Sequence, residues 1–187
     1  WSNVAKGQPN YLGQYQPRVP ADLGFYNLKD PSVFEEQAKL ARRYGLHGFI
    51  FYYYRFKDGR MLHKPLDLFL NNPQIDINFS LCWANENWTR RWDGKNDDVI
   101  KSQDYSLDAL LEVLSDLTRY SEDPRYIRVN GRPVLFIYRY TELTASNMDA
   151  EKIKLIAAEN GFQKPYIVIV ESMNLSNDNT LKAFRGV

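Results

Sequence analysis

Apolar residues follow two periods along this chain. Between residues 33 and 44 they recur every three or four positions behind Asp30-Pro31, an N-cap acceptor followed by a proline at the first helical position, and this pattern predicts a helix. Residues 48–54 are apolar and aromatic on both alternating faces, which is typical of a strand covered on two sides. Leucines between residues 107 and 117 again have helical spacing, and Ser106 supplies the cap.

The later apolar runs extend this alternation. We expect a short helix at 65–70, a strand at 75–83, a polar loop up to residue 105, strands at 126–129 and 133–138 joined by an Asn130-Gly131 turn, a helix at 148–160, a strand at 166–170 and a short helix at 180–184. Helices that alternate with strands imply parallel strands linked by right-handed crossovers. The predicted fold class is therefore α/β.

Two α/β architectures fit this pattern. One is a (β/α)₈ TIM barrel, of which a chain of 187 residues can form only a part, because a whole barrel takes about 250 residues. The alternative is an open doubly wound α/β sheet, which fits the length. No predicted strand is followed by a GxGxxG or P-loop sequence, so the usual nucleotide-binding signatures of the open sheet are missing.

Composition narrows the range of partners. The 24 basic and 23 acidic residues form no block of one sign, which gives no reason to expect a nucleic-acid partner. Cys82 is the only cysteine, and inside a predicted strand it is expected to be a buried small side chain rather than a nucleophile. His47 and His63 complete no ligand set with metal spacing, so we expect no metal or cofactor. No apolar run reaches the roughly 18 residues of a membrane span.

Residues 81–94 have the most unusual composition in the chain. Three of the four tryptophans lie there, together with Glu86, two asparagines and two adjacent arginines. Tryptophan offers a flat apolar face, arginine offers a planar set of hydrogen-bond donors, and amides and carboxylates offer acceptors. Together these groups suit a flat ligand that is rich in hydroxyl groups or anionic. The alternative is that Trp83, Trp88 and Trp92 belong to the core or to an oligomer interface.

Polar and aromatic residues also follow the other predicted strands. In either architecture the carboxyl ends of the parallel strands form the functional face. Glu86 is the candidate catalytic acid, and the alternative is that it holds Arg90 or Arg91 in an ion pair. The candidate ligand-binding residues are Tyr54, Trp83, Asn85, Asn87, Trp88, Arg90, Arg91, Trp92, Tyr138 and Glu171.

Several segments resemble one family. They are residues 13–18, 23–26, 48–54, 64–66, 81–94 and 130–133. Together they resemble the WbsX-type glycosyltransferase family of bacterial polysaccharide biosynthesis, which is similar to the endo-α-mannosidase-like glycoside hydrolases of family ninety-nine. The resemblance implies a (β/α)₈ barrel without a metal or cofactor. It further implies action on an oligosaccharide or sugar-nucleotide substrate of lipopolysaccharide, O-antigen or capsule metabolism, in the cytoplasm or at the inner membrane surface.

The resemblance also implies that residues 1–187 are a single α/β domain from a larger barrel, without its first strand and its C-terminal strands. A later family motif, Asn-Glu-Trp-x-Glu-Gly, matches the catalytic glutamate pair of the hydrolases and is not found in this chain. Glu86 would then position the substrate or order its loop, and Glu86 with Glu171 is the only carboxylate pair at predicted strand ends. Arg55 departs from the family, which is expected to have tryptophan there. Glycosyl transfer, glycoside hydrolysis and non-catalytic glycan binding or scaffolding all remain open.

Overall fold

The computed structural model describes residues 1–90 and 94–170, and these fall into two compact units. The first unit consists of Trp1–His47 and Lys64–Ile77, and the second of Gly48–His63 and the chain from Asn78 onward. The expected single domain therefore stays a prediction.

The first unit is helical. Its helices are α1 (Ser2–Ala5), α2 (Pro31–Arg43) and α3 (Lys64–Leu70). The predicted cap of α2 is confirmed, because the Asp30 side chain accepts a 3.0 Å hydrogen bond from the Ser32 backbone N–H. Helices α2 and α3 pack through Phe34 and Phe69, whose ring centroids lie 6.1 Å apart in an edge-to-face arrangement.

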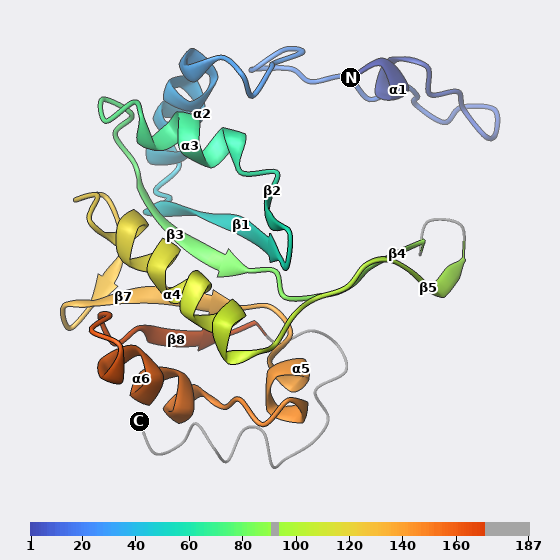
Figure 1. Ribbon diagram of the computed structural model, residues 1–187. Helices are drawn as coiled ribbons and strands as arrows, with labels where there is room; N and C mark the ends of the chain where they lie inside the picture. Colours follow the sequence, from blue (N-terminus) through green and yellow to red (C-terminus); the bar gives the residue numbers. More distant parts are fainter. Residues whose placement is uncertain (91–93, 171–187) are drawn as a thin grey trace. The chain divides into compact units, whose positions relative to one another are not determined.

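The second unit is built on a mixed sheet of six strands (Figure 1). Its strands are β1 (Gly48–Phe56), β2 (Gly59–Met61), β3 (Asn78–Trp83), β6 (Arg128–Val129), β7 (Arg132–Ile137) and β8 (Tyr166–Ile169). Strands β1, β3, β7 and β8 are parallel and neighbour one another in chain order, while β2 and β6 pair antiparallel with β1 and β7. An open doubly wound sheet reverses its strand order at a switch point. The described part of the sheet has no such reversal and does not close, as expected of an incomplete barrel.

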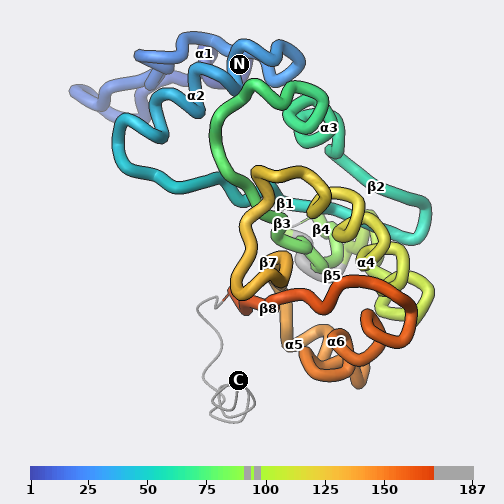
Figure 2. Tube along the Cα trace, turned by 90° about the vertical axis from the view of Figure 1, so that its left-hand side faces the viewer, coloured from blue at the N-terminus to red at the C-terminus, as the bar shows by residue number. Residues whose placement is uncertain are grey.

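Helices α4 (Leu107–Ser121), α5 (Tyr140–Ala145) and α6 (Ala150–Glu159) also belong to the second unit. Helix α4 crosses one face of the sheet, where it contacts β7 and α6 (Figure 2). The predicted cap of α4 is confirmed by the 3.3 Å hydrogen bond that the Ala109 N–H donates to Ser106 Oγ. The leucines of its apolar stripe, including Leu110, Leu114 and Leu117, are buried.

The two faces of the sheet differ in exposure. Tyr53, Trp83 and Ile137 lie in register across β1, β3 and β7 and are all buried on the side of α4, which we call the helix face. The other side, which we call the open face, carries Ile50 and Tyr52 of β1, which are 50% and 55% exposed. Because side chains alternate along a strand, Tyr54 belongs to the open face.

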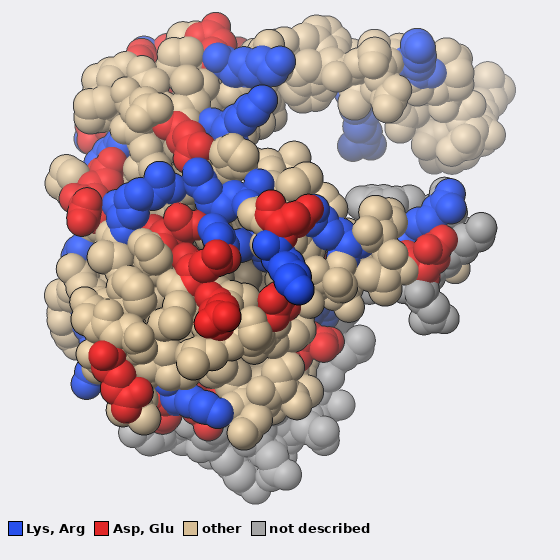
Figure 3. Space-filling view, viewed as in Figure 1, with Lys and Arg blue, Asp and Glu red and all other residues tan. Residues whose placement is uncertain are grey.

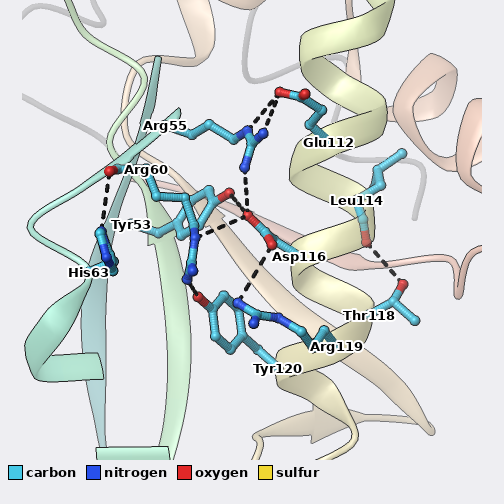
Figure 4. A network of polar contacts seen from close by, with 10 residues as sticks. All are labelled: Tyr53, Arg55, Arg60, His63, Glu112, Leu114, Asp116, Thr118, Arg119 and Tyr120. Atoms are coloured by element: carbon cyan, nitrogen blue, oxygen red, sulfur yellow. Dashed lines mark hydrogen bonds and ion pairs between the residues drawn. The ribbon is translucent and has the colours of Figure 1, made fainter. Parts of the chain in front are cut away.

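A polar network fastens α4 to the helix face of β1 (Figure 4). Asp116 of α4 accepts hydrogen bonds from the Tyr53 hydroxyl at 2.5 Å and from Arg55 Nη1 at 2.9 Å. Arg55 Nε also donates to Glu112 at 2.9 Å, and Arg60 donates to the Tyr120 hydroxyl. Arg55 therefore lies on the face opposite Tyr54. The position at which the sequence departs from the family pattern is thus one that contacts helix α4.

Most predicted elements are confirmed, and the differences lie in the polar segments. Asn130 and Gly131 both have positive φ, at 51° and 76°, as the predicted tight turn requires. The strand expected at 75–83 begins at Asn78. The segment expected as a polar loop up to residue 105 contains the β4–β5 hairpin, with β4 at Trp88–Arg90 and β5 at Lys95–Lys101. Helix α5 was also missed, and the helix expected at 180–184 lies outside the described residues.

Candidate functional site

A pocket of about 470 Å³ lies in the second unit beside the β4–β5 hairpin. Its lining residues are Tyr54, Leu62, Glu86, Asn87, Trp88, Thr89 and Ile100. Four of them, Tyr54, Glu86, Asn87 and Trp88, were candidates from the sequence, and they come from the ends of β1 and β3 and from β4. The volume lies within the range of roughly 300–1,000 Å³ that small-molecule sites occupy. The pocket therefore brings together four of the predicted residues.

One side of the pocket is aromatic. The Trp88 ring meets the Tyr54 ring edge to face, with centroids 5.4 Å apart, and meets Phe56 in the same way at 5.1 Å. Tyr54 in turn stacks on Tyr52 at 6.1 Å, and the Tyr52 ring meets Tyr138 at 5.8 Å. These contacts hold Trp88 in place and continue the aromatic surface from the pocket along the open face.

Partial burial raises the pKa of the Tyr54 hydroxyl, and nearby Tyr52 and Glu86 add to the shift. Burial raises the pKa of Tyr52 in the same way. Both phenols therefore stay neutral near pH 7 and can donate as well as accept hydrogen bonds. Burial also raises the pKa of the Cys82 thiol to about 11, so this buried thiol is protonated, in line with its predicted role as a small packed side chain.

Asn85 is fully buried, and the backbone of Arg139 binds both ends of its amide. Its Nδ2 donates to the Arg139 carbonyl at 2.8 Å, and its Oδ1 accepts from the Arg139 N–H at 2.8 Å. The Tyr105 hydroxyl donates to the Asn85 carbonyl at 2.6 Å. We call the pair of bonds to Arg139 the Asn85 clamp. Because both ends of the amide are engaged in the clamp, Asn85 joins the end of β3 to the end of β7 rather than facing the pocket.

Glu86 is half-buried in the pocket lining, and its ionic partner in the described chain is Arg139. Its Oε2 lies 3.5 Å from Arg139 Nε, and the Arg139 guanidinium lies over the Tyr138 ring at 5.0 Å from the centroid. The alternative partner Arg90 instead pairs with Asp98 of β5 at 3.6 Å. Arg139 directly follows a strand that the sequence predicted, but it was not among the candidate ligand-binding residues.

Asn87 Oδ1 accepts a 2.7 Å hydrogen bond from the Gln103 backbone N–H, which ties the β3–β4 loop to the segment before α4.

Trp83 lies on the helix face and is 1% exposed, with its indole N–H enclosed and unpaired among the described residues. Its ring is therefore part of the core and not of the pocket. Tyr138 contacts Tyr52 beyond the pocket lining. The candidates Arg91, Trp92 and Glu171 lie outside the described residues.

Pairing of opposite charges is common on the surface. Figure 3 shows acidic and basic side chains next to one another on the viewed face.

Across residues 1–90 and 94–170, three or more histidine, cysteine or acidic side chains nowhere gather as metal ligands would. No helix in the described part of the chain is long and apolar enough to cross a membrane.

The family model for glycosyltransferase WbsX matches residues 1–187. The uncharacterized protein WxcX of Xanthomonas campestris pv. campestris strain B100 is 40% identical over 171 residues, and strain ATCC 33913 has an equally similar WxcX. The match covers 91% of this chain, which spans 25% of the length of these curated relatives.

Two solved structures share the fold. One is the GH99 endo-α-mannosidase of Bacteroides thetaiotaomicron, with a TM-score of 0.51 and 13% identity over 82% of this chain and 41% of that one. The other is a glycoside hydrolase-like protein, with a TM-score of 0.52 and 14% identity over 91% of this chain and 56% of that one. At these identities the likeness shows the fold alone, an incomplete barrel of the GH99 type. The family match over the whole sequence shows that this chain belongs to the glycosyltransferase WbsX family.

Proposed function

We propose that this chain forms part of a carbohydrate-active enzyme of bacterial surface-polysaccharide metabolism, and that its pocket binds one sugar unit of an oligosaccharide or sugar nucleotide. The family membership supports a sugar substrate. The observation that carries the assignment of the site is the convergence of the Trp88 ring, the Glu86 carboxylate and the Asn87 amide around one pocket. A sugar presents an apolar face to an aromatic ring and hydroxyl groups to such polar groups.

The reaction is glycosyl transfer or glycoside hydrolysis. Cleavage of a glycosidic bond with two protein carboxyl groups places them about 5–5.5 Å apart for retention or about 6.5–9.5 Å apart for inversion. Glu86 is the only carboxylate among the described lining residues of the pocket, and Glu171, the second member of the predicted pair, lies outside the described residues. We assign Glu86 to substrate binding, with the acids of the reaction in the longer protein.

Binding is tested by titrating the intact protein with α-linked mannotriose, maltotriose and chitotriose in a calorimeter. Replacing Trp88→Ala removes the ring beside Tyr54, and we expect the affinity for the bound saccharide to fall at least about tenfold. Trp1→Ala is the matched control, because Trp1 lies in the first unit and packs on Phe25 and Tyr26. Unchanged affinity of the Trp88 variant would show that the pocket is not the sugar site.

A non-catalytic glycan-binding role is the second candidate, favoured by the single described carboxylate of the pocket. Incubating the intact protein with sugar nucleotides and with oligosaccharides, followed by mass spectrometry, separates the possibilities. Free sugar released without a donor indicates hydrolysis, and an extended oligosaccharide indicates transfer. Saturable binding with neither product supports the non-catalytic role.

A further inference from the structure

Glu86 and Arg139 form a pair at the edge of the pocket in which only one member lines it. The Glu86 side chain is 32% exposed, and it accepts no hydrogen bond from the described part of the chain. Arg139 is 25% exposed and lies beside the carboxylate, 3.5 Å from Oε2, without contributing to the pocket lining. The carboxylate therefore keeps acceptor capacity for a ligand while a cation stands next to it.

The backbone sets the separation of these two groups. The Asn85 clamp fixes the peptide groups of Arg139 directly beside the residue that precedes Glu86. One residue earlier on each strand, the Tyr138 N–H donates to the Trp83 carbonyl at 3.1 Å. An exposed ion pair between two free side chains contributes little, because ordering both side chains costs entropy. Here the backbone of Arg139 and the residue before Glu86 are held by hydrogen bonds that do not involve the ion pair.

The side chain of Arg139 is restrained as well. Its guanidinium lies over the Tyr138 ring at 5.0 Å, and such a stacked arrangement suits the planar guanidinium better than a lysine ammonium. Tyr138 is itself held by the edge-to-face contact with Tyr52. The cation is thus directed at Glu86 from a rigid part of the sheet end.

We propose that Arg139 is a positioning residue, which holds the Glu86 carboxylate in the orientation that accepts hydrogen bonds from the sugar. This role rests on the proposed function of the pocket. Arg139 acts through Glu86 and does not touch the ligand. The two neighbours Asn85 and Glu86 therefore have different roles. Asn85 holds the backbone of Arg139, and Glu86 accepts hydrogen bonds from the sugar.

A double-mutant cycle tests the proposal. Saccharide affinity is measured for the intact protein, Glu86→Gln, Arg139→Met and the double variant, with the trisaccharide of the panel above that binds most tightly. We expect Arg139→Met alone to weaken binding about tenfold. In the Glu86→Gln background the same change should have almost no further effect, because the group it orients has lost its charge. Arg139→Lys should restore part of the affinity, since it keeps the charge.

Controls separate this role from the others. Arg42→Met, which removes an arginine paired with Asp76 in the first unit, should leave affinity unchanged. If the losses of Glu86→Gln and Arg139→Met add in full, Arg139 acts independently of Glu86 and the proposal is overturned. Melting temperatures of all variants are recorded, and a binding loss that follows a large fall in melting temperature also overturns it. Saccharide binding that Arg139→Met leaves unchanged overturns only the role of Arg139, whereas absence of binding by the unsubstituted protein overturns the proposed function and this role together.

Discussion

Asn85 and Arg139 are 54 residues apart in the chain, yet the side-chain amide of one forms two 2.8 Å hydrogen bonds with the backbone of the other. The arrangement continues the pairing of β3 with β7 beyond the last residues of both strands. A buried amide of this kind contributes most through what its loss leaves behind, because the backbone N–H of its partner would lose its acceptor and the carbonyl would lose a donor.

Asn85→Ala is therefore expected to lower the free energy of unfolding by about 2–4 kcal/mol. The loss combines two broken hydrogen bonds to the Arg139 backbone with a small cavity. Urea unfolding followed by far-ultraviolet circular dichroism measures it. Asn3→Ala, at an exposed position of α1, is the matched control and should stay within about 0.5 kcal/mol of the unsubstituted protein. A loss below about 1 kcal/mol for Asn85→Ala would contradict the structural importance of the clamp.

Asp116→Ala is expected to cost about 3 kcal/mol of stability, because it removes the acceptor that Tyr53 and Arg55 share and leaves a partly buried guanidinium with one partner fewer. Glu112→Ala is the comparison, since Glu112 binds the same arginine but its side chain is 53% exposed. We expect less than about 1 kcal/mol for that variant. Equal costs in the same unfolding assay would show that the exposed and the buried partner of Arg55 contribute alike.

Acid destabilisation should involve Asp123. Burial works to raise the pKa of this carboxyl, but hydrogen bonds from the side chain and the backbone N–H of Arg125 hold it below its usual value of 3.8. A carboxyl with a lowered pKa in the folded state stabilises the protein above its unfolded pKa, and this contribution is lost as pH falls through the folded pKa. The stability difference between the unsubstituted protein and Asp123→Asn should therefore be full at pH 7 and shrink below about pH 4. A difference that is constant with pH would contradict this assignment.

Ligand charge should matter at the pocket. Its described lining residues include Glu86 and no basic residue, the neighbouring Arg139 is paired with Glu86, and Arg90 pairs with Asp98 on the hairpin. The pocket should thus prefer neutral sugars over the anionic ligands that the sequence also allowed. We expect a glucuronate-terminated trisaccharide to bind at least about tenfold more weakly than its glucose counterpart, with the gap narrowing at high salt. Stronger binding of the uronate would contradict the charge assigned to the site.

Sequence periodicity predicted the elements whose burial depends on their own pattern. The leucine stripe of α4, its Ser106 cap and the Asn130-Gly131 turn all follow from local residues. The β4–β5 hairpin was not predicted because residues 95–101 are mostly polar and show no alternation of apolar and polar residues. Its pairing is a backbone interaction between β4 and β5, to which hydrophobic patterning gives no signal.

The candidate site was predicted as a region and not residue by residue. Composition located Glu86, Asn87 and Trp88, but it could not tell which amide faces a ligand and which binds backbone, because that depends on a residue from a distant strand. Trp83 illustrates a second limit. Its place on the helix face follows from its register with Tyr53, which depends on the pairing of β1 with β3.

The enclosure of Trp83 has a spectroscopic consequence. An indole buried on the helix face of the sheet should give near-ultraviolet circular dichroism that depends on intact tertiary packing. The half-buried Trp88 stands at the pocket, where its emission should respond to a bound sugar. The protein thus carries two optical reporters in the same stretch of sequence, one for the integrity of its core and one for occupancy of its pocket.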